Sequence, residues 1–345
     1  MIKSHLLISA IIIISILGLV SCAPAKGNVY PLSSDYLREG NLLAELSRIA
    51  AIQPELAQVR IIGFSSSENI PIYALEIGNN KAAKQALLIG QHHGDEVLGV
   101  NIAMALAENL LLNFNIDPAY KQLLQNYQIW IVPSINPEGW RMVSSGKFQH
   151  KRKNNRDTDK NKKLDLRTDG VDLNRNYPVF WDLDADANTI SPYYKGAEPA
   201  SESEVKAIIN LAQQHKFSLA IFLHSSASGA YSEKVYLPAR GNDSKLYQET
   251  LALAEKYAKS VKRDYHSGTY EVHTGVSSEV GNARNFFFHS MGCKAFLVEI
   301  GGINSRGRSV IHPNNKMLNR IVQKQVRSLT QVFLDLAADN PETKP

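Results

Sequence analysis

Gln91-His92-His93-Gly94-Asp95-Glu96 follows directly on the short apolar run Ala86 to Gly90. The run has the length and composition of a strand buried in the centre of a sheet. His93 and Glu96 stand three positions apart, so a helix that begins near Gly94 would place both side chains on one face, within reach of one ion. Imidazole nitrogen and carboxylate oxygen bind zinc at ~2.0–2.2 Å, which leaves little freedom for a loosely placed ligand. The segment predicts part of a metal site at the end of a central strand.

Two further residues with suitable side chains stand at the ends of apolar runs downstream. The run 219–223 leads into His224, and the run 295–298 leads into Glu299. With the upstream pair they supply two imidazoles and two carboxylates, the inventory of a hydrolytic zinc centre and its base. A catalytic zinc usually takes three protein ligands and keeps a fourth position for water. His92 is less well placed than its neighbour, because only His93 has a glutamate three residues on, and we expect His92 to point away or to lie outside the ligand set.

The order of apolar segments indicates the fold class. Strands are expected at residues 59–63, 70–77, 86–90, 129–132, 219–223 and 293–298, and helices at residues 97–112, 246–261 and 316–338. Strands that alternate with helices indicate an α/β fold, here a single domain with one mixed central sheet flanked by helices. Ligands at strand ends agree with the rule that α/β sites form outside the carboxyl ends of the strands.

Residues 1–21 have the pattern of a bacterial lipoprotein signal peptide. Lys3 supplies a positive start, an apolar run follows, and Leu19-Val20-Ser21-Cys22 resembles a lipobox. The run is shorter than the ~20 residues of a comfortable membrane span. We expect cleavage before Cys22, lipidation of its thiol and attachment to a membrane of the cell envelope, on the periplasmic or the outer-surface side. The alternative is a free cysteine in an ordinary signal peptide. Residues 22–34 then form the anchor and linker, and residues 35–340 the catalytic domain.

Charge and cysteine content narrow the function classes. Removal of residues 1–21 takes away Lys3 only, so the formal net charge falls from +5 to +4. Such a mild charge gives no strong case for a nucleic-acid partner. Cys293 is then the single cysteine beyond Cys22, so an internal disulfide is not expected and the domain must be stabilised by its core.

Three more motifs lie between the two histidine segments, and they make the pattern specific. They are Asn136-Pro137-Glu138-Gly139, Arg152-Lys153-Asn154 and the run from Gly170 to Pro178. In this order, followed by His224 and Glu299, the motifs resemble the zinc metallocarboxypeptidase family of the carboxypeptidase A type, which includes bacterial murein peptide amidases. The resemblance extends from about residue 36 to about residue 337, nearly the whole chain beyond the signal peptide.

The resemblance implies a role for each matched residue. His93, Glu96 and His224 match the zinc ligands, and Glu299 matches the general base that takes a proton from water and delivers it to the leaving amine. Arg152 matches the arginine that polarises the scissile carbonyl and stabilises the oxyanion. A solvated basic run is the competing interpretation of Lys151 to Lys153.

Asn174 and Arg175 match the pair that holds the terminal carboxylate of the substrate. A planar guanidinium binds a carboxylate through two parallel hydrogen bonds, which a lysine does not do. The expected substrate is therefore a peptide with a free C-terminal carboxylate, and the expected enzyme is an exopeptidase.

The chain departs from the animal digestive members at two positions. Ser277, 22 residues before Glu299, stands where those members have a mobile tyrosine. Tyr270 is a possible substitute only if the intervening loop contains a gap. Arg284, 15 residues before Glu299, stands where those members set side-chain preference. An arginine there implies an acidic departing residue, and a surface arginine in a shifted alignment is the alternative.

These features imply a membrane-anchored zinc exopeptidase acting on short peptides. Arg284 and an envelope location favour cell-wall peptides cleaved between γ-D-glutamate and meso-diaminopimelate, whose side chain carries a second carboxyl group. The alternatives are a broad-specificity carboxypeptidase and a non-catalytic peptide-binding lipoprotein. The aspartoacylase and desuccinylase branch also has an H-x-x-E and a distant histidine, but the wide gap before His224 and the Arg152 motif argue against it.

The segment Asp157 to Asp165 resembles half of a calcium loop. Its alternating oxygen-bearing side chains suit calcium, but the sixth position is Lys162 where the usual turn has glycine. We expect a solvated surface loop.

Overall fold

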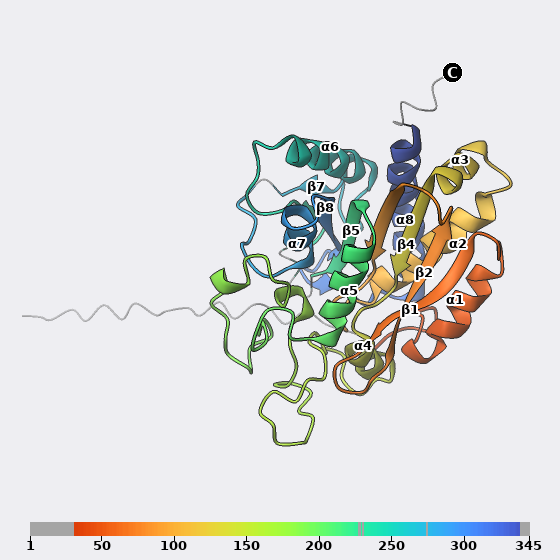
Figure 1. Cartoon of the computed structure of the whole chain (residues 1–345). Coiled ribbons are helices and arrows are strands. Elements are labelled where there is room, and N and C mark those ends of the chain that lie inside the picture. The colour runs from red at the N-terminus through yellow and green to blue at the C-terminus, as the bar shows by residue number, and fades with distance from the viewer. Residues whose placement is uncertain (1–30, 227–228, 230, 274, 339–345) are drawn as a thin grey trace, which may run out of the picture.

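An eight-stranded mixed β-sheet forms the centre of the computed structural model (Figure 1). The structure describes residues 31–338 except 227–228, 230 and 274, so the expected signal peptide and Cys22 lie outside the described residues. The strand order is β1-β2-β4-β3-β5-β8-β6-β7. The strands are β1 (Ala57–Phe64), β2 (Pro71–Gly78), β3 (Lys84–Ile89), β4 (Tyr127–Val132), β5 (Phe217–Ser225), β6 (Lys234–Tyr236), β7 (Glu271–Val272) and β8 (Lys294–Ile300). A separate two-stranded sheet pairs β9 (Gly302–Ile303) with β10 (Ser309–Val310).

The four central strands β4, β3, β5 and β8 are parallel, whereas β1 and β2 form an antiparallel hairpin at one edge. Parallel strands covered on both faces are expected to read as continuous apolar runs, and β3 and β5 do so. Because parallel strands end at the same edge of a sheet, the segments after β3, β5 and β8 meet at one edge. This edge carries the candidate site.

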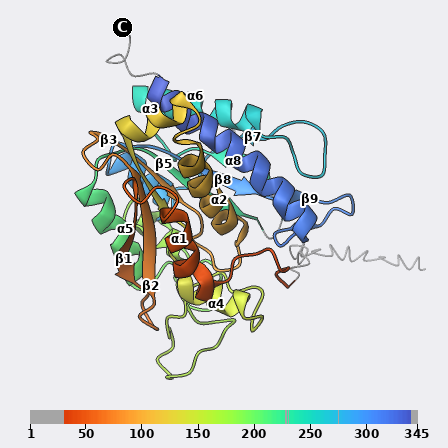
Figure 2. The ribbon, with the colours of Figure 1, turned by 90° about the vertical axis from the view of Figure 1, so that its right-hand side faces the viewer.

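Helices cover both faces of the sheet (Figures 1 and 2). The α-helices are α1 (Leu42–Ala50), α2 (Leu98–Asn113), α3 (Pro118–Asn126), α4 (Pro137–Ser144), α5 (Ser203–Gln214), α6 (Lys245–Ser260), α7 (Ala283–His289) and α8 (Asn315–Ala338). Three short 3-10 helices are η1 (Glu39–Asn41), η2 (Leu173–Arg175) and η3 (Trp181–Leu183). Figure 2 shows α1, α2 and α8 together on the face turned to the viewer.

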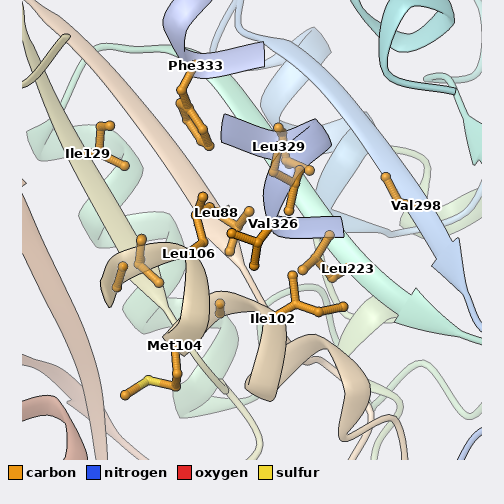
Figure 3. Close-up of a cluster of buried hydrophobic side chains, with 14 of the residues drawn as sticks. Leu88, Ile102, Met104, Leu106, Ile129, Leu223, Val298, Val326, Leu329 and Phe333 are labelled. Atoms are coloured by element: carbon orange, nitrogen blue, oxygen red, sulfur yellow. The ribbon is translucent and has the colours of Figure 1, made fainter. Parts of the chain in front are cut away.

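Each face of the sheet has its own apolar core, because successive strand residues point to opposite faces. Leu88 of β3 packs with residues of α2 and α8, and Figure 3 shows this cluster around Ile102 and Phe333. Its neighbour Leu87 belongs to the other core, with residues of α5 and α7. The central strands are thus packed against an apolar core on each face. This packing fixes the positions of the side chains at their carboxyl ends.

The expected fold class is confirmed: a single mixed sheet is flanked by helices. All the strands and helices expected from the apolar pattern are present, with small shifts of their ends. The elements that were not expected are helices α1, α3, α4, α5 and α7 and the short strands β6, β7, β9 and β10. Over the described residues, none of the helices combines the length and apolar character that a membrane crossing requires.

Candidate metal centre and substrate site

The three expected metal ligands come from two neighbouring strands. His93 and Glu96 lie just beyond β3, and His224 is the penultimate residue of β5. In the parallel β3–β5 ladder Ile89 pairs with Phe222, so the two strands end side by side. This pairing brings together residues that are far apart in the sequence.

His93 and Glu96 do not lie on a helix, so a helix beginning near Gly94 is not what brings the two side chains together. Helix α2 begins at Leu98, and the two ligands share a turn in which the Glu96 N–H donates to the His93 carbonyl at 3.0 Å. Close packing enforces the turn: a Cβ at Gly94 would stand 2.4 Å from the carbonyl carbon of Gly139 in α4. The turn still points both side chains the same way.

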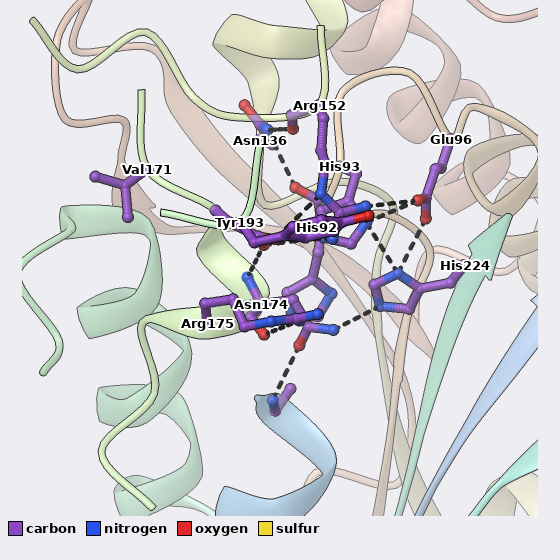
Figure 4. A network of polar contacts seen from close by, with 12 residues as sticks. His92, His93, Glu96, Asn136, Arg152, Val171, Asn174, Arg175, Tyr193 and His224 are labelled. Atoms are coloured by element: carbon purple, nitrogen blue, oxygen red, sulfur yellow. Dashed lines mark hydrogen bonds and ion pairs between the residues drawn. The ribbon is translucent and has the colours of Figure 1, made fainter. Parts of the chain in front are cut away.

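The ligand atoms converge in a small triangle (Figure 4). His93 Nδ1 lies 2.8 Å from Glu96 Oε1, His224 Nδ1 lies 2.9 Å from Glu96 Oε2, and the two Nδ1 atoms are 3.1 Å apart. Ligand atoms around a tetrahedral zinc with bonds of about 2.0–2.1 Å stand about 3.3 Å apart. All three side chains are nearly fully buried. Two imidazoles that present the same nitrogen to one carboxylate are a donor set that fits Zn²⁺.

Asp172 orients the first of these imidazoles and was missed in the sequence. Its Oδ1 lies 3.0 Å from His93 Nε2, and the carboxylate is fully buried. Metal-binding histidines usually donate their second ring nitrogen to such an acceptor. Burial alone would raise the pKa of Asp172, but Arg152 and His93 hold it well below its usual value. An aspartate two residues before the Asn174-Arg175 pair was the signal available in the sequence.

His92 lies outside the ligand set, as expected. Its ring stacks on His224 with centroids 5.2 Å apart, and its Nε2 lies 3.1 Å from the Tyr177 hydroxyl. The ring therefore supports one face of the His224 imidazole.

Glu299 faces the same site from the neighbouring strand. It pairs directly with His224 in the parallel β5–β8 ladder, so the two side chains share one face of the sheet. Its Oε2 is buried and has no hydrogen-bond partner among the described residues. Burial and the nearby Glu96 carboxylate raise the pKa of Glu299 above its usual value. A carboxylate with a raised pKa and an oxygen without a hydrogen bond, beside the three ligands, is suited to proton transfer.

Arg152 reaches into the site from the loop after α4. Its Nε and Nη2 donate to Asp172 Oδ2 at 3.1 and 2.7 Å, and its Nη1 lies 3.4 Å from Glu96 Oε1. The flanking residues Lys151 and Lys153 are buried and donate to backbone carbonyls, so the interpretation as a solvated basic run was wrong. The buried lysines fix the loop so that the Arg152 guanidinium lies beside the metal ligands.

Asn174 and Arg175 belong to η2, next to Asp172. The Asn174 side chain accepts from the Ala283 N–H at 3.1 Å, and its Nδ2 lies 3.4 Å from His224 Nε2. Arg175 Nη1 donates to the Asn174 carbonyl at 2.9 Å, and its Nε is 3.7 Å from Asp184 Oδ2. The Arg175 guanidinium is thus loosely held and about one-fifth exposed.

Arg284 is buried on α7 with 5% of its surface exposed, so the alternative of a surface arginine was wrong. Among the described residues its Nη2 donates to Ser278 Oγ at 3.3 Å, and its Nε has no partner. Burial, and then the charge of Arg175, lower the pKa of Arg284 to about 10, while Glu299 opposes this shift. The guanidinium carbon of Arg284 lies 5.7 Å from the centroid of the Tyr236 ring.

The two candidates for the tyrosine position do not supply that group. Ser277 Oγ donates to the Leu237 carbonyl at 2.8 Å. Tyr270 is buried, and its hydroxyl contacts Asp264 and Gln325. Neither offers a phenol to the metal ligands.

The calcium-like loop carries a cluster of three carboxylates, from Asp157, Asp159 and Asp169, with ligand atoms within 4.8 Å of one another. Asp165, the last residue of the calcium-like segment, caps a turn at Arg167 and Thr168. Lys162 adopts a left-handed backbone with φ of 64°, so the absence of glycine does not prevent the turn. Asp159 is exposed, as in a solvated loop.

Comparison with known proteins assigns the chain to a family. The sequence profile of the zinc carboxypeptidases matches residues 42–327. The chain belongs to the zinc carboxypeptidase family. Mouse carboxypeptidase A6 is 30% identical over 196 residues, which cover 56% of this chain and 42% of that relative. Mouse carboxypeptidase A2 is 29% identical over 66% of this chain and 52% of its own length. The match thus spans about half the length of these curated relatives.

Solved structures show that this member of the zinc carboxypeptidase family shares its fold with known proteins. Bovine thrombin-activatable fibrinolysis inhibitor, in complex with tick carboxypeptidase inhibitor, superposes with a TM-score of 0.71 at 19% identity, over 88% of this chain and 98% of that one. Carboxypeptidase A from Helicoverpa armigera superposes with a TM-score of 0.72 at 19% identity. The match covers 89% of this chain and 75% of that one. At this identity the comparison supports the fold, and His93, Glu96 and His224 supply the family's zinc-binding character.

Proposed function

We propose that this protein is a zinc-dependent carboxypeptidase that hydrolyses the C-terminal amide bond of short peptides. The observation that carries the proposal is the unpartnered Oε2 of Glu299 beside three converging metal ligands. An unpaired buried carboxylate costs stability, which is reasonable where it is needed as a base. A peptide-binding protein without catalysis would have no use for this arrangement.

Each residue has a role that follows from its position. His93, Glu96 and His224 would hold a Zn²⁺ ion, which would act as a Lewis acid and would lower the pKa of a bound water. Glu299 takes a proton at Oε2 and returns it to the leaving amine. Arg152 offers N–H groups to the negative charge that develops on the carbonyl oxygen. Arg175 is free to bind the terminal carboxylate through two hydrogen bonds.

Arg284 supports a preference for an acidic departing residue. A guanidinium that is nearly fully buried and makes one side-chain hydrogen bond among the described residues lacks a neutralising partner. A carboxylate on the substrate side chain would provide one and would recover part of the cost of burial. Glutamate, aspartate and meso-diaminopimelate carry such a group.

A location in the cell envelope makes cell-wall peptides the natural substrates within this class. The lipobox around Cys22 supports attachment to an envelope membrane, and the γ-D-glutamyl–diaminopimelate bond is the bond to be cut. Replacing Cys22 with alanine should move the protein from the membrane fraction to the soluble fraction. An unchanged distribution would count against the anchor.

Substrate preference is tested with four peptides and one charge reversal. The purified enzyme should cleave L-Ala-γ-D-Glu-meso-diaminopimelate, or at least a peptide ending in L-glutamate, faster than peptides ending in leucine or lysine. Arg284→Asp should lose the acidic preference and gain activity on the lysine peptide. Arg308→Asp, at an exposed position, is the matched control and should change neither.

The outcomes separate the alternatives. Equal cleavage of all four peptides indicates a broad-specificity carboxypeptidase. Cleavage of leucine peptides with none of the acidic ones would reject the role of Arg284. Zinc bound at one equivalent without hydrolysis of any peptide would leave the binding lipoprotein as the better description and would overturn the proposed catalysis.

A further inference from the structure

The ring of Tyr193 lies against both arginine side chains of the site (Figure 4). The guanidinium carbon of Arg152 is 5.2 Å from the ring centroid, and that of Arg175 is 5.6 Å away. Both distances are within the ~6 Å range of a cation–π interaction. Nearly half of Tyr193, 47%, is exposed. Figure 4 shows the ring between the two arginines.

The loop that carries Tyr193 is fastened to the same residues that build the metal centre. The Asp172 N–H donates to the carbonyl of Tyr194 at 2.8 Å. Lys153, next to Arg152, donates from Nζ to the Thr189 carbonyl at 2.8 Å. The position of the ring is therefore tied to the positions of Asp172 and Arg152.

The two arginines depend on the ring to different degrees. Arg152 is fixed by two hydrogen bonds to the Asp172 carboxylate. Arg175 has a bond to the neighbouring Asn174 carbonyl and a carboxylate 3.7 Å from its Nε. An aromatic ring contacts the face of a guanidinium and leaves its N–H edge free for a carboxylate. The ring can thus hold Arg175 in place without blocking the hydrogen bonds that a substrate would need.

We propose that Tyr193 is a substrate-positioning residue whose ring holds Arg175 ready for the terminal carboxylate and forms a wall beside the departing residue. This inference rests on the proposed carboxypeptidase function. Tyr193 presents an aromatic ring to both arginines, whereas Ser277 is bonded to Leu237 and Tyr270 is buried. Tyr193 lies on a different loop from Ser277 and Tyr270, and it contacts the arginines through its ring rather than its hydroxyl.

The test compares three single variants with the wild type on the best-cleaved peptide. Tyr193→Ala should raise KM about five- to tenfold, the loss expected from the cation–π contact with Arg175, and change kcat by less than about twofold, because Arg152 keeps its two hydrogen bonds to Asp172. The effect falls on KM because Arg175 contacts the carboxylate equally in the ground state and the transition state. Tyr193→Phe keeps the ring and should restore KM to near the wild-type value. Ile190→Ala, exposed on the same loop, is the control and should leave both constants unchanged.

A binding measurement separates this inference from the proposed function. In the Glu299→Gln background, calorimetry with the uncleaved peptide should show the same five- to tenfold weakening for Tyr193→Ala. If the wild type cleaves peptides but Tyr193→Ala binds them with wild-type affinity, the proposed positioning role of Tyr193 is wrong. The proposed carboxypeptidase function is then unaffected. Equal losses in Tyr193→Phe and Tyr193→Ala, or an equal loss in Ile190→Ala, also overturn it. Tyr193→Leu, which preserves bulk without a π face, replaces Tyr193→Ala if the latter fails to fold, and the same weakening is expected.

Discussion

At the scale of single residues, the site combines side chains whose hydrogen bonds are satisfied with others, such as Glu299, whose hydrogen bonds are not. Asp172 contacts His93 and Arg152 and accepts the Asn174 N–H. Glu299, in contrast, keeps a buried oxygen without a hydrogen bond among the described residues. Satisfied groups fix geometry, whereas an unsatisfied base remains free to accept a proton.

The role of Glu299 predicts a variant that binds metal but does not turn over. Glu299→Gln preserves shape and removes the base, so kcat should fall about 10²–10⁴-fold. Zinc content, measured by elemental analysis, should remain at one equivalent. Glu255→Gln, on the outer side of α6, is the control and should keep full activity. Undiminished turnover by Glu299→Gln would rule out this residue as the base.

The contact between Asp172 and His93 predicts an effect on metal affinity. Asp172→Asn removes the negative charge that stabilises the ring orientation, and zinc affinity should fall about 10- to 100-fold. Competition with a chromogenic chelator measures the change. Asp182→Asn, at an exposed aspartate in η3, should leave the affinity unaltered. If both variants bind zinc as the wild type does, Asp172 has no part in orienting the ligand.

At the scale of elements, buried carboxylates hold the loop that carries Arg152. Glu138 of α4 accepts the Asn155 N–H at 3.0 Å, and Glu204 of α5 accepts the side chains of Asn154 and Ser66. Helices α4 and α5 therefore fix a loop that lacks regular structure. The Glu204 carboxylate also makes stability depend on pH.

Burial raises the pKa of Glu204 from 4.5 to about 7. Between these values the folded protein keeps a proton that the unfolded chain has released, so this residue's contribution to stability is full below pH 4.5 and is lost as the pH rises to 7. The shift corresponds to at most about 3 kcal/mol. The free energy of unfolding of Glu204→Gln, taken relative to that of the wild type, should therefore rise between pH 5 and pH 8.

Chemical denaturation at the two pH values measures this gain. Glu55→Gln, at an exposed position, should show no such difference between pH 5 and pH 8. If the free energies of unfolding of the wild type and Glu204→Gln differ by the same amount at pH 5 and at pH 8, Glu204 does not titrate between these two pH values.

Much of the sheet was predictable from the sequence because buried parallel strands leave continuous apolar runs. Helix α5 has apolar residues at Val205, Ile208 and Leu211, so its periodic signal was present but not used. Helix α7 is harder, since three consecutive phenylalanines are typical of a strand. It is a helix because the Asn282 side chain caps its first turn. The metal ligands and Glu299 were predictable from motifs that follow strands.

The remaining features of the site depend on tertiary contacts. The turn at Gly94 is set by the backbone of α4, which local propensity does not report. The contacts of Asp172 with His93 and of Tyr193 with the two arginines join segments with no periodic relation. Only the assembled fold places them together.

At the scale of the whole molecule, metal binding and folding are coupled. The ligands come from two strands that adjoin only in the folded sheet, so zinc stabilises the native state by mass action. Removal of zinc with a chelator should lower the melting temperature by about 5 °C or more, and zinc should restore it.

Differential scanning fluorimetry measures this shift, with His93→Ala as the control. The variant lacks one ligand and should melt at nearly the same temperature with and without zinc. Identical melting of the metal-loaded and metal-depleted wild type would show that the site does not bind zinc tightly.

The pairing of His224 with Glu299 has a consequence for how this protein can change over time. Insertion or deletion of a single residue inside β5 would turn His224 to the opposite face of the sheet, away from Glu299, and would disrupt both cores at once. Surface loops such as the segment 157–169 face no such constraint. Descendants of this protein should therefore vary in loop length and substrate choice, while the lengths of β5 and β8 stay the same.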